Sequence, residues 1–137
     1  MKRSAVVVAS VGLLASGVAL TDNLEGADRL LCAPTEIKIC VEDADCYPAH
    51  ASELGVPDFI IVDLKNKKLQ TTKASGQTRS TAFSVSRNAG KIYLQGIENG
   101  RAFSFVIDEA TARMTVAVSR DGVAVNAFGA CTNAKVE

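Results

Sequence analysis

The sequence KIYLQGIENGRAFSFVID, residues 91–108, has the pattern of a β-hairpin. Two runs rich in alternating apolar and polar residues, 91–97 and 102–108, flank the tetrapeptide Glu98-Asn99-Gly100-Arg101. Asn-Gly between such runs is the strongest short-range hairpin signal, because both residues adopt positive φ angles readily. The stretch therefore predicts two antiparallel strands joined at Asn99-Gly100.

Similar short runs, separated by turn residues, occur on both sides of this hairpin. They are Thr35–Val41, Phe59–Leu64, Lys68–Thr72, Arg79–Ser86, Arg113–Ser119 and Val123–Cys131. Short strands at regular spacing are typical of an antiparallel meander. A flat sheet of seven or eight such strands would leave its edges exposed. We therefore predict a mainly β fold in which the meander closes into a small barrel, with the first strand beside the last.

The alternation within the strands also predicts which side chains face the barrel interior. With 5% aromatic residues and no Trp, the core must be filled mainly by aliphatic side chains. On strand geometry the inward residues of two neighbouring strands are expected to be Phe103, Phe105 and Ile107 with Met114, Val116 and Val118.

One short helix is expected after the first strand. The segment Pro48–Leu54 begins with a proline, which is tolerated in the first turn of a helix, and Gly55 follows as a stop signal. The rest of the chain after residue 29 has the rhythm of strands and turns, so the sequence predicts no other helix there.

The first nineteen residues have the layout of a secretory signal peptide. Lys2 and Arg3 precede an uncharged run that ends near Gly17-Val18-Ala19, and this run is too short for a membrane span. We predict cleavage after Ala19, a flexible leader over residues 20–29 and a single domain over residues 30–137. The mature protein is expected to be periplasmic or secreted, without a membrane span.

The charge balance of the mature chain argues against polyanionic partners. Removing Lys2 and Arg3 from the 15 basic residues leaves 13 against 15 acidic ones, a net charge of about −2. The sequence has no basic stripe or cluster interleaved with aromatic residues, which nucleic-acid binding usually requires. No nucleic-acid partner is expected.

Four cysteines, at positions 32, 40, 46 and 131, allow three disulfide pairings. Export favours oxidation. We favour Cys40 with Cys46, which closes an acidic loop, and Cys32 with Cys131, which the barrel places on neighbouring strands. The second bond would close a loop of about 100 residues and stabilise the domain by about 4.7 kcal/mol in the chain-entropy description.

Two metal sites compete with this interpretation. Cys40, Cys46 and His50 form C-x5-C-x3-H, but the spacing misses that of common zinc sites and a fourth ligand is not evident. The acidic residues Glu42, Asp43 and Asp45 suit calcium in type, but the further oxygen ligands and turn glycine of a calcium loop are missing. We predict no metal and no cofactor.

No catalytic constellation is recognisable. The single histidine, His50, has Ser52 and Glu53 near it in sequence only, and no serine lies in a G-x-S-x-G elbow. A pair of carboxylates for acid-base chemistry is still a possible catalytic site. Its possible members, at strand ends or turns, are Asp63, Glu98, Asp108 and Glu109.

Loops at the barrel ends are the other candidate sites. Their candidate binding residues are Ser75, Gly76, Asn99, Arg101 and Arg120.

The assembled pattern resembles a family of short exported proteobacterial proteins of unknown function. The resemblance is carried by Leu30-Leu31-Cys32-Ala33, Cys40 and Cys46, Pro57–Ile60, Val62–Lys65, Leu94–Gly96, Glu98–Arg101, Val106–Thr111 and Phe128–Thr132. It spans most of the mature chain and implies one domain with two disulfides.

A second, distant similarity is to C-type lysozyme inhibitors. It rests on the Ser-Gly of Ala74-Ser75-Gly76-Gln77, and this chain lacks their Tyr-x-Cys element.

These observations favour a non-enzymatic binding module of the cell envelope that uses its loops or a modest cavity to hold a protein or small apolar ligand. The alternative is an inhibitor of a secreted hydrolase such as lysozyme. An accessory subunit of an envelope complex and a carboxylate-pair hydrolase are further hypotheses.

Overall fold

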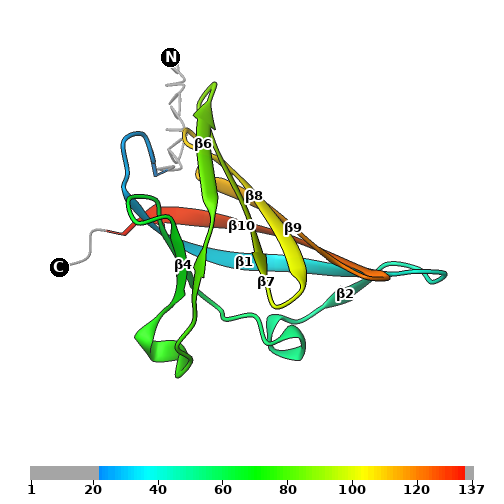
Figure 1. Ribbon diagram of the computed structural model, residues 1–137. Coiled ribbons are helices and arrows are strands. Elements are labelled where there is room, and N and C mark those ends of the chain that lie inside the picture. The colour runs from blue at the N-terminus through cyan, green and yellow to red at the C-terminus, as the bar shows by residue number, and fades with distance from the viewer. Residues whose placement is uncertain (1–21, 135–137) are drawn as a thin grey trace, which may run out of the picture.

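The computed structural model describes residues 22–134, in which the chain forms one antiparallel sheet that curls into a nearly closed barrel (Figure 1). The strands are β1 (Arg29–Val41), β2 (Tyr47–Ala49), β3 (Ile60–Asp63), β4 (Lys68–Thr71), β5 (Ser80–Ala82), β6 (Ser84–Asn88), β7 (Lys91–Glu98), β8 (Arg101–Asp108), β9 (Arg113–Arg120) and β10 (Val123–Asn133). The predicted signal peptide, residues 1–19, lies outside the described residues. The mainly β, antiparallel, barrel-like fold is confirmed.

The barrel closes through one continuous segment of chain. The strand order is β5-β4-β3-β1-β10-β9-β8-β7-β6, so β5 and β6 lie at opposite ends of the sheet. They are nevertheless consecutive in sequence, separated only by Phe83. The first half of this segment pairs with β4 and the second half pairs with β7. Because the chain itself runs from one end of the sheet to the other, neither end is a long free edge.

Two details of the predicted fold are wrong. The described residues form ten strands rather than seven or eight, because Arg79–Ser86 divides at Phe83 into halves with different partners and because β2 adds a short strand beside β1. The helix predicted over Pro48–Leu54 does not form. Its first residues pair with β1 as β2, and only a single 3₁₀ turn, η1 (Ala51–Leu54), follows. A seven-residue segment has little helical stability of its own, so strand pairing prevails.

The hairpin at residues 91–108 forms as predicted. Glu98 pairs with Arg101, and the two residues between them, Asn99 and Gly100, have φ angles of 48° and 73°. These angles fit a type I′ turn, whose twist matches that of the flanking strands.

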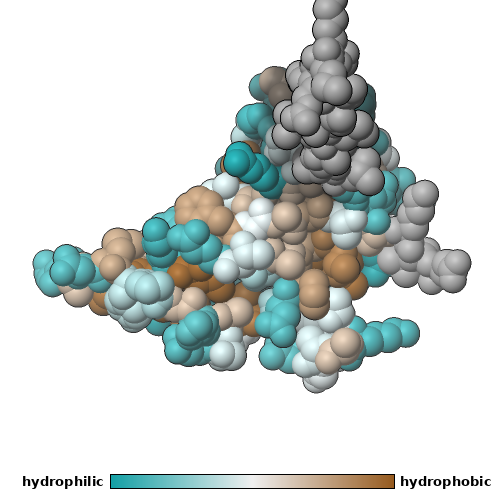
Figure 2. All heavy atoms as spheres, turned by 180° about the vertical axis from the view of Figure 1, so that it is seen from behind, coloured by the Kyte–Doolittle hydropathy of each residue, from teal (hydrophilic) through white to brown (hydrophobic). Residues whose placement is uncertain are grey.

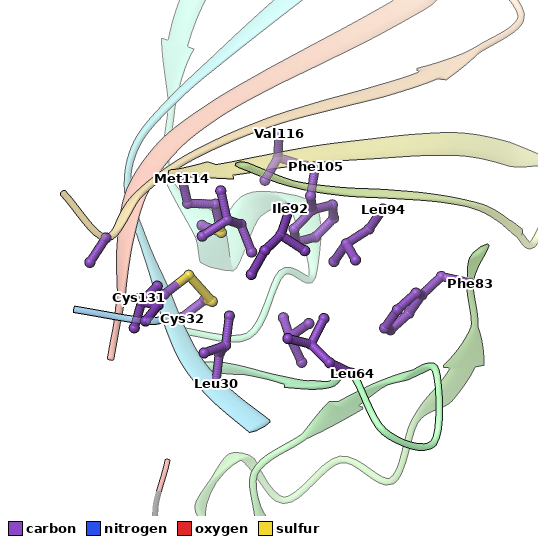
Figure 3. Packing of buried hydrophobic residues seen from close by; sticks show 14 of the residues in the cluster. Leu30, Cys32, Leu64, Phe83, Ile92, Leu94, Phe105, Met114, Val116 and Cys131 are labelled. Atoms are coloured by element: carbon purple, nitrogen blue, oxygen red, sulfur yellow. A yellow bond between two sulfur atoms is a disulfide. The ribbon is translucent and has the colours of Figure 1, made fainter. Parts of the chain in front are cut away.

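The hydrophobic core lies inside the barrel, where the inward faces of the strands meet (Figure 3). Phe103, Phe105, Ile107, Met114 and Val116 are buried as predicted, and the half-buried Val118 packs against them. Leu30, Val62, Ile92 and Leu94 contribute from the other strands and are fully buried.

A bulge in β1 keeps both halves of this long strand facing the core. Cys32 and Ile37 are both buried although they are five positions apart, which in a regular strand would put them on opposite faces, and the register with β10 shifts between Pro34 and Glu36. Gly129 of β10 lies opposite this bulge, where a Cβ atom would come within 2.9 Å of the Pro34 Cα. The extra residue reverses the alternation of the strand, and the glycine lets the two backbones approach.

The segment before β1 closes one end of the barrel. Leu24 is fully buried and Ala27 is 4% exposed. The Leu24 amide donates to the Glu109 carbonyl over 2.8 Å, Arg87 Nη2 donates to the Ala27 carbonyl over 2.7 Å, and the Leu64 amide donates to the Asp28 carbonyl over 2.9 Å. Residues 22–28 thus form a plug that contacts the β8–β9 turn, the β3–β4 turn and strand β6.

Both predicted disulfides are present. Cys32 and Cys131 lie directly opposite each other on β1 and β10, and their bond is buried in the core near Leu30 (Figure 3). Cys40 and Cys46 close the acidic loop between β1 and β2. Two disulfides are consistent with an extracytoplasmic location. Among residues 22–134 no helical segment has the length and apolar character needed to cross a membrane.

We expect the two disulfides to contribute unequally to stability. The Cys32–Cys131 bond joins residues 99 apart and the Cys40–Cys46 bond residues 6 apart. Chain entropy alone then predicts losses of about 4.7 and about 2 kcal/mol when each is removed. Urea unfolding of the Cys32→Ala/Cys131→Ala and Cys40→Ala/Cys46→Ala double variants measures both losses. Equal losses would contradict the view that the β1–β10 bond stabilises the closed barrel most.

Candidate functional site

A partly open pocket of about 150 Å³ lies at the end of the barrel opposite the plug. Strands β8, β9, β10 and β1 supply one wall, and the ends of β3, β4, β5 and β7 supply the other. The segment after η1 also lines the pocket. The lining residues are Pro34, Ile37, Leu54, Gly55, Val56, Pro57, Ile60, Leu69, Gln70, Thr71, Arg79, Thr81, Glu98, Arg101, Phe103, Phe105, Met114, Val116, Val118, Val125 and Ala127.

The interior of the pocket is apolar because it continues the core-facing side of the sheet. Phe103 and Phe105 lie edge to face with ring centroids 5.9 Å apart, an arrangement favoured by aromatic pairs. Gly96 on the neighbouring strand makes room for the Phe103 ring, since a Cβ atom there would come within 2.8 Å of Phe103 Cε1. Figure 2 shows hydrophobic surface continuing between the polar tip of the β1–β10 arm and the body of the molecule.

An ion pair with a third polar partner crosses the mouth of the pocket. Arg79 Nη2 donates to Glu98 Oε2 over 2.7 Å, and the Thr81 hydroxyl donates to Glu98 Oε1 over 2.6 Å. Arg79 Nη1 also donates to the Gly55 carbonyl over 3.4 Å. These contacts tie β5, β7 and the segment after η1 together, so they fix the shape of the pocket mouth.

The environment of Glu98 favours its charged form. Partial burial raises the pKa of this carboxyl group, but the hydrogen bonds from Thr81 and Arg79 and the positive charges of Arg79 and Arg101 outweigh burial and lower the pKa below its usual value of 4.5. Glu98 is therefore a carboxylate at neutral pH, with both oxygens held by protein donors.

Arg101 completes the mouth from the first residue of β8. It faces inward with Phe103 and Phe105, because residues two apart on a strand share a face, and it is half-buried. Its charge acts on Glu98, yet within residues 22–134 its guanidinium makes no ion pair or hydrogen bond. Arg101 thus presents donors to the pocket mouth that the described part of the chain leaves without acceptors.

The structure gathers only some of the predicted binding residues at the pocket. Arg101 lines it, and the exposed Asn99 lies in the adjoining turn. Ser75 and Gly76 end the 3₁₀ turn η2 (Lys73–Ser75), and the Ser75 hydroxyl donates to the Thr72 carbonyl over 2.7 Å, which holds that turn. Arg120 is exposed at the last position of β9 and does not line the pocket.

Sequence reasoning did not identify Arg79, Thr81 and Glu98 as a cluster. The signal for it was present in the alternation of the strands. Arg79 and Thr81 are in phase with the buried Phe83, and Glu98 is in phase with the buried Leu94. Charged residues at core-facing positions near strand ends indicate an inward-facing polar mouth.

The possible carboxylate pair is not brought together. Asp63 is buried and accepts hydrogen bonds from the backbone and side chain of Asn66 over 2.8 and 2.9 Å. Asp108 accepts a bond from Lys91 Nζ over 2.8 Å, and Glu109 lies 3.5 Å from Arg87 Nε. All three lie at the plugged end of the barrel, so among these four carboxylates only Glu98 lines the pocket.

The residues considered as metal ligands are engaged otherwise. Cys40 and Cys46 are bonded to each other, so neither sulfur can bind zinc as a thiolate. The exposed His50 precedes η1, where its backbone amide donates to Glu53 Oε2 over 3.3 Å. No group of three or more potential ligands gathers within residues 22–134.

Comparison with known proteins gives no match to a family model, a curated protein or a solved structure. The resemblances seen in the sequence therefore stay predictions.

The lowered pKa of Glu98 predicts a pH-dependent contribution to stability. A carboxyl group whose pKa is lower in the folded state stabilises the fold above its unfolded pKa, and this contribution disappears as pH falls through the folded value. We expect Glu98→Gln to reduce the free energy of unfolding by about 1–2 kcal/mol at pH 7, with the difference shrinking toward pH 3. Urea unfolding at several pH values measures it.

Glu36→Gln is the matched control, because Glu36 forms an exposed ion pair with Lys38 and is expected to contribute little. A Glu98→Gln difference that persists unchanged at pH 3 would show that packing, and not charge, is what the substitution disturbs.

Proposed function

We propose that this chain is a non-enzymatic binding module of an exported protein, and that it takes an apolar group of its ligand into the barrel pocket. The observation that carries this proposal is the pocket itself, which is preformed, apolar inside and polar at its mouth. That combination is typical of sites that bind small molecules or single side chains.

The size of the pocket limits what it can hold. Pockets for drug-sized ligands usually measure at least about 300 Å³, which is twice the volume found here. An apolar cavity of about 150 Å³ is large enough for a benzene-sized group. The pocket therefore suits one ring or a short branched alkyl group, and the rest of the ligand would project through the mouth.

The walls of the pocket support binding by a rigid scaffold. Most of the apolar lining comes from strands whose backbone groups are paired on both sides, and the Arg79–Glu98 ion pair holds the mouth. A preorganised site loses little conformational freedom when the ligand enters, which favours affinity.

The chemistry of the lining supports binding over catalysis. Its residues include one carboxylate, Glu98, whose two oxygens are held by Arg79 and Thr81. They include no serine, cysteine, histidine or lysine, the residue types that usually act as nucleophile or base.

We place this function in the periplasm or outside the cell. The supporting observations are the two disulfides, which persist in oxidising compartments, and the signal-peptide layout of residues 1–19.

Filling the pocket should abolish binding of small apolar probes. Val125 lines the pocket and is half-buried, so Val125→Phe would occupy its volume. We expect xenon and benzene to shift the NMR signals of pocket residues in the native protein and to lose this effect in the variant. Val106→Phe is the matched control, because Val106 is on the outer face of β8 and 37% exposed. Equal binding by the Val125→Phe variant would contradict the pocket as the site.

The protruding loop between β1 and β2 favours a second candidate, inhibition of a secreted hydrolase. Residues 42–46 are exposed, are closed by the Cys40–Cys46 bond and lie at the tip of the long β1–β10 arm (Figure 1). A rigid loop of this kind can enter an enzyme cleft. Lysis of bacterial cells by lysozyme, followed as loss of turbidity with excess protein, tests it. Undiminished lysis would remove lysozyme as the target.

A further inference from the structure

The charges at the pocket mouth do not cancel. The lining contains two arginines and one glutamate, which leaves one positive charge above an apolar interior. Glu98 is satisfied by Arg79 and Thr81, and Arg79 also reaches the Gly55 carbonyl. The positive charge that remains is that of Arg101.

The guanidinium of Arg101 is positioned to donate hydrogen bonds to an acceptor group of a ligand. Its side chain is half-buried on the same face as Phe103, so part of its hydration is lost. Across the β7–β8 turn it attracts Glu98, but no ion pair or hydrogen bond to it forms within residues 22–134. A planar guanidinium presents donors in a fork that matches the two oxygens of a carboxylate.

We infer that the pocket is selective for a carboxylate joined by a short linker to one ring or branched alkyl group, with Arg101 binding the carboxylate and the apolar interior taking the group. This inference rests on the proposed binding function and gives its ligand a chemical class. The volume of about 150 Å³ sets the size of the apolar group. The position of Arg101 at the first residue of β8, two residues before Phe103, keeps the linker short.

Two sources can supply this chemistry. One is a free small acid, and the other is the C-terminal residue of a polypeptide with an apolar side chain, whose carboxylate and side chain are similarly close. The Arg101 guanidinium and the pocket would bind the same groups in either case.

The test compares 3-phenylpropionate with its neutral amide, 3-phenylpropanamide, on the full mature protein at pH 7 and low salt. The two probes share the ring and linker, so calorimetric titration isolates the carboxylate. Since a hydrogen bond to a charged group contributes about 1.5–3 kcal/mol, we expect the acid to bind about 10- to 100-fold more tightly than the amide.

Variants at Arg101 assign the preference to one side chain. Arg101→Gln should abolish the preference for the acid, and Arg101→Lys should keep part of it, because a lysine retains the charge without the planar fork. Arg120→Gln is the matched control, since Arg120 is exposed and does not line the pocket. Thermal unfolding of each variant confirms that it is folded. An acid preference that survives Arg101→Gln would overturn the assignment.

The outcomes separate this inference from the function on which it rests. If benzene binds and the acid binds no more tightly than the amide, the inference fails and the binding function stands. If neither benzene nor either probe binds, both fail. Peptides ending in phenylalanine, with a free or an amidated C-terminus, distinguish the sources. Binding of the free-carboxylate peptide supports a polypeptide terminus, and binding of 3-phenylpropionate alone supports a free small acid.

Discussion

The antiparallel pairing of β1 with β10 is the constraint on which the rest of the structure depends. Residues from the two ends of the described chain meet there, so a meander that would otherwise be an open sheet becomes a ring. Pairing two distant segments has a large entropic cost. The Cys32–Cys131 bond lowers this cost, because it already restricts the conformational entropy of the unfolded chain. The bulge after Pro34 lies in the same strand pair. It lets side chains from both halves of β1, before and after the bulge, face the barrel interior.

The barrel is filled at one end and open at the other because its two ends receive different side chains. Leu24 and Ala27 occupy the interior beside the Cys32–Cys131 bond, and their segment is held there by backbone hydrogen bonds to turns of the sheet. At the opposite end the inward positions of β9 and β10 carry Val118 and Val125, a cross-strand pair of short side chains that line the pocket without filling it. The pocket is therefore a consequence of where large and small aliphatic residues occur along neighbouring strands.

Alternation within strands predicted the parts of this structure that depend on local pattern. The Asn99-Gly100 turn and the inward set around Phe105 follow from the sequence, since turn chemistry and a period of two fix them. Both disulfides form as favoured, and the Cys32–Cys131 pairing depended on the predicted closure of the barrel. The rest depends on contacts between distant residues. Nothing near Leu24 indicates that an isolated leucine in a polar segment fills a barrel end, and the bulge in β1 is visible only against its partner Gly129.

The candidate site lies where charged residues occupy inward positions that are apolar elsewhere in the barrel. Arg79, Glu98 and Arg101 occupy core-facing positions of their strands, where an aliphatic residue would pack without any loss of hydration. For Glu98 and Arg79 the loss is offset within the protein, by each other and by Thr81. For Arg101 no hydrogen bond or ion pair within the described residues offsets the loss of hydration. Sequences that fold well keep local and global preferences consistent, and departures from that consistency are expected at functional sites. A half-buried arginine without an acceptor among residues 22–134, above an apolar pocket, is such a departure, and it is the reason we propose a binding site at the open end of the barrel.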